Sequence, residues 1–270
     1  MTAIVIIPAR YDSTRFPGKP LAPLNGKPLI RHVYENSKKS KLAEDVIVAT
    51  DSDAIFKTVI EFGGKAVMTS KEHASGTDRI AEVAASFDYD IIVNVQGDEP
   101  LIRAEMIDDV IRLLDDKRAA MGTLIKKIED PEEIFDPNVV KAVFDKEGFA
   151  MYFSRAPIPF DRDEFRIQDA GYKIQDKDNR ASCIMYHASD IQTSGLLMYK
   201  HLGIYSYRRA ALLNLAKMEP VELEKTEKLE QLRALVNGFR IKVKETTYET
   251  VGVDTPQDLE RVKKWLSLSS

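Results

Sequence analysis

Short apolar runs alternate with amphipathic stretches along the first half of the chain. Four of these runs have the length and composition of buried strands: residues 3–7, 46–49, 65–68 and 91–95. Apolar residues at helical spacing separate them, starting near Pro28, Ser52 and Thr77. This alternation predicts an α/β fold with a doubly wound, mostly parallel, Rossmann-like sheet that carries helices on both faces.

The second half of the chain is less regular. We expect strands at 121–128, 139–144, 149–153 and 203–207, and helices at 209–217, 223–236 and 256–266. The stretch 161–200 is polar and has no clear period, and a loop of that length is uncommon unless it has a function. We therefore expect a single domain over 1–270 with an irregular insertion or subdomain at 161–200. A lid, a disordered insert and part of a subunit interface all remain open for it.

Composition and charge narrow the class of protein. The chain has 270 residues, of which 44% are hydrophobic, and its net charge of −4 argues against nucleic-acid and anionic-membrane partners. Its single cysteine, Cys183, excludes an intramolecular disulfide. The first strand begins at Ala3, which leaves no room for a signal peptide, and no apolar run reaches the length of a membrane span. We expect a cytoplasmic protein.

Three cations follow the first apolar run. Arg10, Arg15 and Lys19 lie in the loop that begins where this strand ends, and ligands of such sheets bind at the carboxyl ends of the strands. The loop therefore predicts a polyphosphate site, against the alternative of a solvated basic loop. It is not a Walker A motif because Pro20 follows Lys19, and no dinucleotide fingerprint follows the strand.

Two aspartates are candidate metal ligands. Asp98 follows the run 91–95 and should reach the same sheet edge as the basic loop, where Mg²⁺ could join it to phosphate oxygens. An ion pair of Asp98 with Arg15 or Lys19 is the simpler alternative. Asp254 precedes Thr255 and Pro256, and from these residues alone it is more simply interpreted as a helix cap.

Other motifs are weak by themselves. The segment from Ser75 to Arg79 opens a helix whose amides could approach an anion or a base edge, although Thr77 could simply be the N-cap. His201 precedes a strand and is more often structural in that position. Metal spacing among the histidines and a G-x-S-x-G elbow are both missing, which argues against zinc enzymes and α/β-hydrolases.

Taken together, the motifs resemble those of a known enzyme family. The run I-P-A-R-x-x-S-T-R-x-P-G-K-P is joined by Q-G-D-E-P, F-S-R, H-L-G-I-Y, L-E-Q-L-R and V-D-T-P. This set resembles the sugar nucleotidyltransferases and, within them, the 3-deoxy-manno-octulosonate (Kdo) cytidylyltransferases. The resemblance implies transfer of CMP from CTP to the anomeric hydroxyl of Kdo for lipopolysaccharide biosynthesis. It also implies Mg²⁺ and a homodimer formed through a smaller mixed β subregion.

The resemblance assigns roles to individual residues. It implies nucleotide contacts from Pro8, Ala9, Arg10, Ser13, Arg15, Lys19, Ser75, Gly76, Thr77 and Arg79. It implies sugar contacts from Gln96, Arg155, His201, Tyr205, Glu230 and Gln231, with Asp98 and Asp254 as Mg²⁺ ligands. The catalytic set is then Arg10, Arg15, Lys19, Asp98 and Asp254. A guanidinium such as that of Arg155 suits the carboxylate of an acidic 3-deoxy sugar.

Two other functions stay open. A cytidylyltransferase for 8-amino-Kdo or neuraminate would use the same chemistry. A non-catalytic nucleotide-binding regulator belongs to a different class, and it would be indicated by loss of the basic loop or of a metal carboxylate; this chain keeps both.

Overall fold

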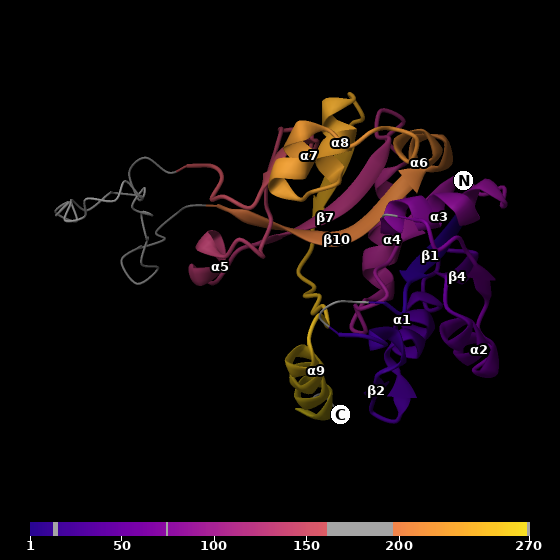
Figure 1. Ribbon diagram of the computed structural model, residues 1–270. Helices are drawn as coiled ribbons and strands as arrows, with labels where there is room; N and C mark the ends of the chain where they lie inside the picture. Colours follow the sequence, from indigo (N-terminus) through magenta and orange to yellow (C-terminus); the bar gives the residue numbers. More distant parts are fainter. Residues whose placement is uncertain (13–15, 74, 161–196, 269–270) are drawn as a thin grey trace, which may run out of the picture.

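A nine-stranded sheet forms the centre of the computed structural model, which describes residues 1–12, 16–73, 75–160 and 197–268 (Figure 1). Its strands run in the order β11 (Ile241–Glu245), β7 (Met121–Lys127), β10 (Tyr199–Arg208), β6 (Ile91–Asn94), β1 (Ala3–Ala9), β4 (Asp45–Thr50) and β5 (Ala66–Met68). β8 (Lys141–Phe144) pairs with β10 and with β9 (Ala150–Ser154). β2 (Pro23–Leu24) and β3 (Lys27–Pro28) form a separate antiparallel pair.

The strand directions confirm the predicted sheet. β1 pairs in parallel with β4 and β6, β4 with β5, and β7 with β11. β10 is antiparallel to both β6 and β7, so the sheet is mostly parallel with one reversed strand inside it. β8, β9 and the start of β10 form the smaller antiparallel part of this mixed sheet. The parallel strands β1 and β6 therefore end at the same edge, as expected for the basic loop and Asp98.

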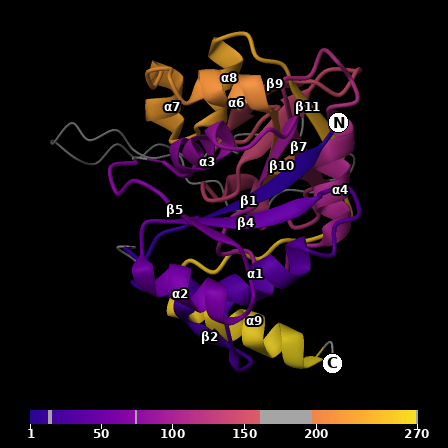
Figure 2. The same ribbon diagram turned by 90° about the vertical axis from the view of Figure 1, so that its right-hand side faces the viewer.

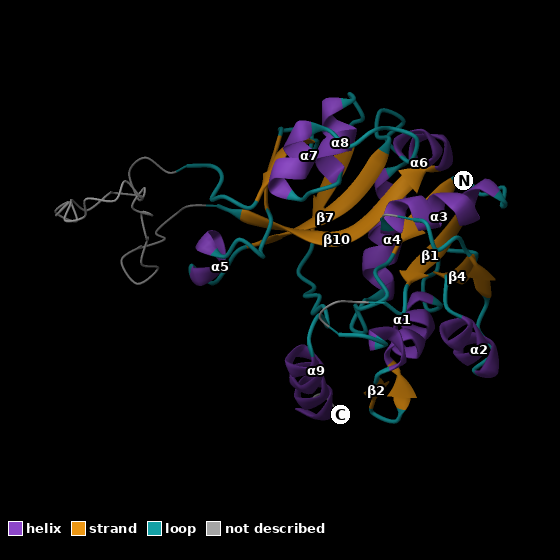
Figure 3. Ribbon diagram, viewed as in Figure 1, coloured by secondary structure: helices purple, strands orange, loops and turns teal. Residues whose placement is uncertain are grey.

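Helices cover both faces of the sheet (Figures 2 and 3). α1 (Leu29–Ser37), α2 (Asp53–Glu61), α4 (Ala104–Leu113) and α9 (Pro256–Leu268) lie on one face, and α3 (Gly76–Ala85), α6 (Arg209–Leu215), α7 (Glu222–Glu227) and α8 (Gln231–Val236) lie on the other. α5 (Glu132–Phe135) and a 3₁₀ turn at Lys19–Leu21 complete the described helices. Alternate residues of β1 enter the two cores, because successive strand side chains point to opposite faces: Val5 packs in the first core and Ile6 in the second.

The structure differs from the sequence predictions at several elements. The predicted helix 223–236 is two helices, because Lys228 adopts a left-handed conformation with φ 54° between α7 and α8. The strand predicted at 203–207 begins at Tyr199, so the irregular stretch does not extend to 200. Residues 161–196, with Cys183, lie outside the described residues. The three alternatives for that stretch, a lid, a disordered insert and part of a subunit interface, therefore stay predictions. α4 and β11 are elements that were not predicted.

A bulge bends β10 where it crosses from β8 to β6. The register with β7 shifts between Leu202 and Tyr205, and the Thr123 hydroxyl donates a 2.7 Å hydrogen bond to the Ile204 carbonyl there. The bend places Tyr205 and Tyr207 beside β6, whose Asn94 and Ile92 are their register partners. Throughout the described residues, every helix is too short or too polar to cross a lipid bilayer.

Candidate active site

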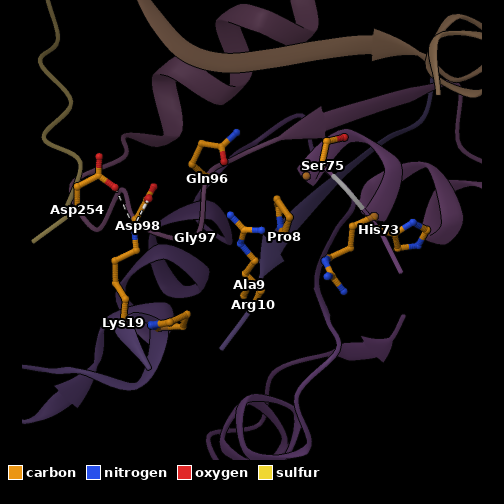
Figure 4. A pocket seen from close by; sticks show the side chains of 13 residues that line it. Pro8, Ala9, Arg10, Lys19, His73, Ser75, Gln96, Gly97, Asp98 and Asp254 are labelled. Atoms are coloured by element: carbon orange, nitrogen blue, oxygen red, sulfur yellow. Dashed lines mark hydrogen bonds and ion pairs between the residues drawn. The ribbon is translucent and has the colours of Figure 1, made fainter. Parts of the chain in front are cut away.

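A cavity of about 270 Å³ lies at the carboxyl ends of β1 and β6. The residues that form its wall are Pro8, Ala9, Arg10, Lys19, Pro20, His73, Ser75, Gly76, Arg79, Gln96, Gly97, Asp98 and Asp254. In Figure 4, Lys19, Asp98 and Asp254 gather on one side of the cavity, and His73 and Ser75 lie on the other. Most residues predicted to bind the nucleotide or Mg²⁺ therefore meet in one place. Ser13 and Arg15, which carry the same prediction, lie outside the described residues.

Gly97 allows the two strand ends to approach closely. A Cβ atom at Gly97 would lie 2.8 Å from the carbonyl oxygen of Pro8, which is closer than real Cβ atoms come to such an atom. Only glycine therefore fits between the loop after β6 and the end of β1. This contact brings Asp98 to the side of the cavity where Lys19 lies.

One ammonium group joins the two predicted metal ligands. Lys19 Nζ lies 2.5 Å from Asp98 Oδ2 and 3.2 Å from Asp254 Oδ1. The backbone fixes the same pair, because the Val253 amide donates a 2.9 Å hydrogen bond to the Asp98 carbonyl. The ion pair of Asp98 with Lys19, which the sequence analysis gave as the simpler alternative, is thus present. The same Lys19 ammonium also pairs with Asp254.

The arrangement of these two carboxylates fits a hard divalent cation. Mg²⁺ in phosphate-binding sites takes one or two carboxylates and completes its shell with phosphate and water oxygens. Among the described residues, no group of three or more His, Cys, Asp or Glu side chains could hold a metal ion alone. Asp98 and Asp254 would therefore hold Mg²⁺ together with the oxygens of a substrate.

Asp254 is not the cap of α9. Thr255 and Asp258 form the cap: the Thr255 hydroxyl accepts from the Asp258 amide at 3.2 Å, and the Asp258 carboxylate accepts from the Thr255 amide at 2.9 Å. The interpretation of Asp254 as a capping residue is therefore wrong. Its carboxylate points to Lys19 instead.

The first turn of α3 closes the opposite side of the cavity. Ser75 is its N-cap and exchanges hydrogen bonds with Asp78, so the expected N-cap role of Thr77 is wrong. Ser75 and Gly76 line the cavity, where the free amides of a helix start favour an anion or a base edge. Thr77 points away from this cavity and donates a 2.6 Å hydrogen bond to Glu230.

The wall next to α3 is held by ion pairs. Arg79 is 4% exposed, and its guanidinium donates to Asp51 at 2.6 Å and to the hydroxyl of Thr69. His73 Nε2 pairs with Glu82 of α3, and this hydrogen bond lowers the pKa of the Glu82 carboxyl. His73 was not predicted as a site residue, because a lone histidine without metal spacing carries little signal in a sequence.

A second, smaller cavity of about 80 Å³ adjoins the first, and Gln96 lines both. Its wall is formed by Thr77, Asn94, Gln96, Met121, Tyr205, Tyr207, Leu215, Glu230 and Gln231. Four of the residues predicted to contact the sugar therefore lie together: Gln96, Tyr205, Glu230 and Gln231. The sequence reasoning missed Asn94, Met121, Tyr207 and Leu215, whose types are ordinary for core positions.

Three polar atoms in this second cavity are buried without a hydrogen-bond partner among the described residues. They are Asn94 Oδ1, the Tyr205 hydroxyl and Glu230 Oε1. Buried polar groups in native proteins are nearly always paired, so three such atoms around one cavity indicate a polar ligand. Burial raises the pKa of Glu230, against hydrogen bonds from Thr77 and Ser75 that lower it.

Arg155 and His201 line neither cavity. Arg155 donates from Nε to the carbonyl of Glu227 at 2.7 Å and from Nη1 to that of Pro137 at 2.6 Å. His201 lies 3.0 Å from the Thr123 hydroxyl through Nε2, and burial lowers its pKa to about 3, so it is neutral at physiological pH. Arg155 thus holds the turn that leads to Glu230, and the His201 ring packs against the ring of Tyr205, which lines the second cavity, with 5.1 Å between the ring centroids.

Comparison with known proteins points to one family. The model of the family described as Cytidylyltransferase matches residues 4–245. The 3-deoxy-manno-octulosonate cytidylyltransferase of Thermodesulfovibrio yellowstonii is 49% identical over 278 residues, covering 100% of both chains. That of Geotalea uraniireducens is 52% identical over 264 residues, covering 97% of this chain and 98% of its own. A solved CMP:2-keto-3-deoxy-manno-octonic acid synthetase complexed with CTP has 37% identity and a TM-score of 0.85, with 100% of both chains covered.

Proposed function

The chain belongs to the cytidylyltransferase family, and we propose that it transfers CMP from CTP to the anomeric hydroxyl of Kdo, releasing pyrophosphate. The observation that carries this proposal is the pair of adjoining cavities that share Gln96. The larger one offers cations, two carboxylates and the amides of a helix start to a nucleoside triphosphate. The smaller one offers buried polar atoms that have no hydrogen-bond partner among the described residues to a hydroxyl-rich sugar. The relatives whose names state this activity match over the full chain.

The nucleotide occupies the larger cavity in this proposal. The triphosphate lies by Arg10 and Lys19, and the base lies toward Ser75 and Gly76 at the start of α3. Nucleotidyl transfer proceeds by in-line attack on the α-phosphorus, so positioning and charge neutralisation supply most of the catalysis. Arg10, Arg15 and Lys19 stabilise the negative charge that builds up on the leaving pyrophosphate.

Asp98 and Asp254 would hold Mg²⁺, which neutralises the α-phosphate and helps the attacking hydroxyl lose its proton. The backbone hydrogen bond from Val253 to Asp98 keeps their segments side by side. Lys19 lies between the two carboxylates and adds a fixed positive charge at the same end of the cavity.

The acidic sugar occupies the smaller cavity. Gln96, Tyr205, Glu230 and Gln231 orient it so that its anomeric hydroxyl faces the α-phosphate. Gln96 is placed to contact both substrates because it lines both cavities. Thr77 holds the carboxylate of Glu230 in position.

The remaining parts of the proposal concern the cellular context. We infer that the protein works in the cytoplasm as a homodimer in lipopolysaccharide biosynthesis, in line with its single cysteine and its resemblance to the Kdo cytidylyltransferases. 8-Amino-Kdo and neuraminate are the alternative acceptors. A non-catalytic regulator is disfavoured because Lys19, Asp98 and Asp254 are all present and meet at one point.

A substrate matrix tests the proposal. Pyrophosphate release is measured with each of the four nucleoside triphosphates, Mg²⁺, and either Kdo, 8-amino-Kdo or neuraminate. We expect turnover with CTP and Kdo, and much less with UTP, because a buried site built for the cytosine amine leaves polar groups unpaired with uracil. Equal turnover with CTP and UTP would contradict the cytidylyl assignment, and turnover with another sugar alone would replace Kdo as the acceptor.

A further inference from the structure

Asp254 lies in a connection that has no regular structure of its own. Residues 246–255 join β11 to α9 without a helix or strand, and Figure 1 shows them as the yellow trace between the sheet and α9. The backbone anchors this connection at both ends. The Thr246 amide donates to the Ile125 carbonyl at 2.9 Å, and the Val253 amide donates to the Asp98 carbonyl at 2.9 Å. Asp254 directly follows the second anchor, so its position depends on that hydrogen bond and on what holds the stretch that leads to it.

An ion cluster holds the middle of the connection. Glu249 Oε1 lies 2.8 Å from Lys200 Nζ, and the other carboxylate oxygen pairs with Lys126 at the end of β7. Lys200 makes a second contact, at 2.6 Å, with Glu133 of α5. Glu249 thereby ties the connection to two strands of the central sheet at one point.

The cluster is built around a nearly buried lysine. The Lys200 side chain is 11% exposed, and an ammonium group at such a site needs carboxylate partners. Burial opposes its charge, yet the hydrogen bonds to Glu133 and Glu249 raise the pKa of Lys200 above its ordinary value. The cluster is therefore charged at physiological pH. The Glu249 side chain is 45% exposed, so its hold on the connection rests on pairing with two ammonium groups at once.

We infer that Lys200 and Glu249, with Lys126, are positioning residues that hold the 246–255 connection so that Asp254 stays beside Asp98. None of these three residues lines the larger cavity, so they act through the connection and not on the substrate. Lys200 directly precedes His201 in β10, so the strand that borders the sugar cavity also fixes the second metal ligand. This inference rests on the proposed Mg²⁺ site.

Metal binding in matched variants tests the inference. Glu249→Gln and Lys200→Met remove the two charges, and Lys200→Arg keeps the charge of Lys200. Lys244→Met is the control, because it removes an ion pair of similar exposure, with Asp109, that lies outside the connection. Mn²⁺ binding is measured by electron paramagnetic resonance in the presence of CTP. We expect Glu249→Gln and Lys200→Met to weaken Mn²⁺ binding roughly 10-fold, as loss of a group that supports metal ligands does. Lys200→Arg and Lys244→Met should stay close to wild type.

Activity gives a second readout. The turnover lost in Glu249→Gln and Lys200→Met should return when Mg²⁺ is raised, with little change in the KM for CTP, whereas a misfolded enzyme would not recover. Unchanged Mn²⁺ affinity in both variants, with wild-type binding intact, would overturn the positioning role alone. A wild-type protein that binds no Mn²⁺ with CTP would overturn the metal site and this inference together.

Discussion

The Thr77 hydroxyl donates a 2.6 Å hydrogen bond to Glu230, although the two residues lie 153 positions apart in the chain. Thr77 belongs to the first turn of α3, whose preceding residues Ser75 and Gly76 line the larger cavity, while Glu230 lines the smaller one. This bond therefore links the wall of the larger cavity, where we propose that the nucleotide binds, to the wall of the smaller one, where we propose that the sugar binds.

Replacing Thr77 tests that link. Thr77→Val keeps the shape of the side chain but removes one of the two hydrogen-bond donors of the Glu230 carboxylate, the other being Ser75, at a cost of roughly 0.5–1.5 kcal/mol. We expect the KM for Kdo to rise more than the KM for CTP. Thr226→Val on exposed α7 is the control, and steady-state kinetics of both variants provide the comparison. An equal rise of both KM values would show that Thr77 does not act through Glu230.

Lys19→Ala removes the ammonium that the two carboxylates share. We expect kcat/KM for CTP to fall, because a charge-assisted contact to the leaving group is lost. The loss of transition-state stabilisation should be roughly 1.5–3 kcal/mol. The same loss is predicted for Arg15→Ala. Lys27→Ala is a suitable control because Lys27 pairs with Glu35 on the surface, at 2.7 Å, and does not line the larger cavity. A Lys19→Ala enzyme with wild-type kcat/KM would remove Lys19 from the catalytic set.

Asp254→Asn separates a metal ligand from a residue that merely stabilises the fold. Since Thr255 and Asp258 cap α9, the substitution should leave the Tm close to that of the wild type. We expect most of the activity to disappear, because the proposed Mg²⁺ site loses one of its two charged ligands. The Tm and the turnover are measured on the same preparation. A stable variant with near-normal turnover would leave Asp98 as the only carboxylate on the metal.

Glu99 gives the protein a stability that depends on pH. Burial and the neighbouring charge of Asp98 raise the pKa of this carboxyl from 4.5 to about 8. The native state therefore holds a proton that the unfolded chain has lost between these two values, so the stability that Glu99 contributes falls as pH rises through this window. The expected loss is a few kcal/mol, at about 1.4 kcal/mol per unit of pKa.

The variant Glu99→Gln isolates this effect. Its amide cannot ionise, so the decline in unfolding free energy between pH 5 and pH 8.5 should be smaller than in the wild type. Denaturant unfolding without nucleotide or metal measures both proteins at the two pH values. Parallel pH profiles for the two proteins would mean that Glu99 is ionised in the folded protein.

Much of the site could be predicted from where the strands end. Buried apolar runs fix β1 and β6, and parallel pairing then brings Arg10 and Asp98 to one edge of the sheet. Asp254 is different, because nothing in its local sequence distinguishes a metal ligand from a helix cap. A contact with Lys19, far away in the chain, directs its carboxylate toward Asp98, and only the family resemblance pointed to a role in metal binding.

The failures have physical reasons as well. Ser75 and Thr77 are both good caps by residue type, and the tertiary contact with Glu230 takes Thr77 away from the helix end. α4 carries buried Met106, Ile107 and Val110 at helical spacing. This pattern would have predicted the helix from the sequence. Arg155 and His201 line neither cavity, because a sequence motif does not say which way a side chain points, and their contacts with the sugar stay predictions.

The fate of the phosphates tests the central claim most directly. The enzyme is given Kdo, Mg²⁺ and CTP labelled with ³²P at either the α- or the γ-phosphate, and the sugar product and pyrophosphate are separated. Attack on the α-phosphorus predicts that the α label appears in the sugar nucleotide and the γ label in pyrophosphate. Transfer of the γ label to the sugar, or release of either label at the same rate without Kdo, would contradict a cytidylyltransferase.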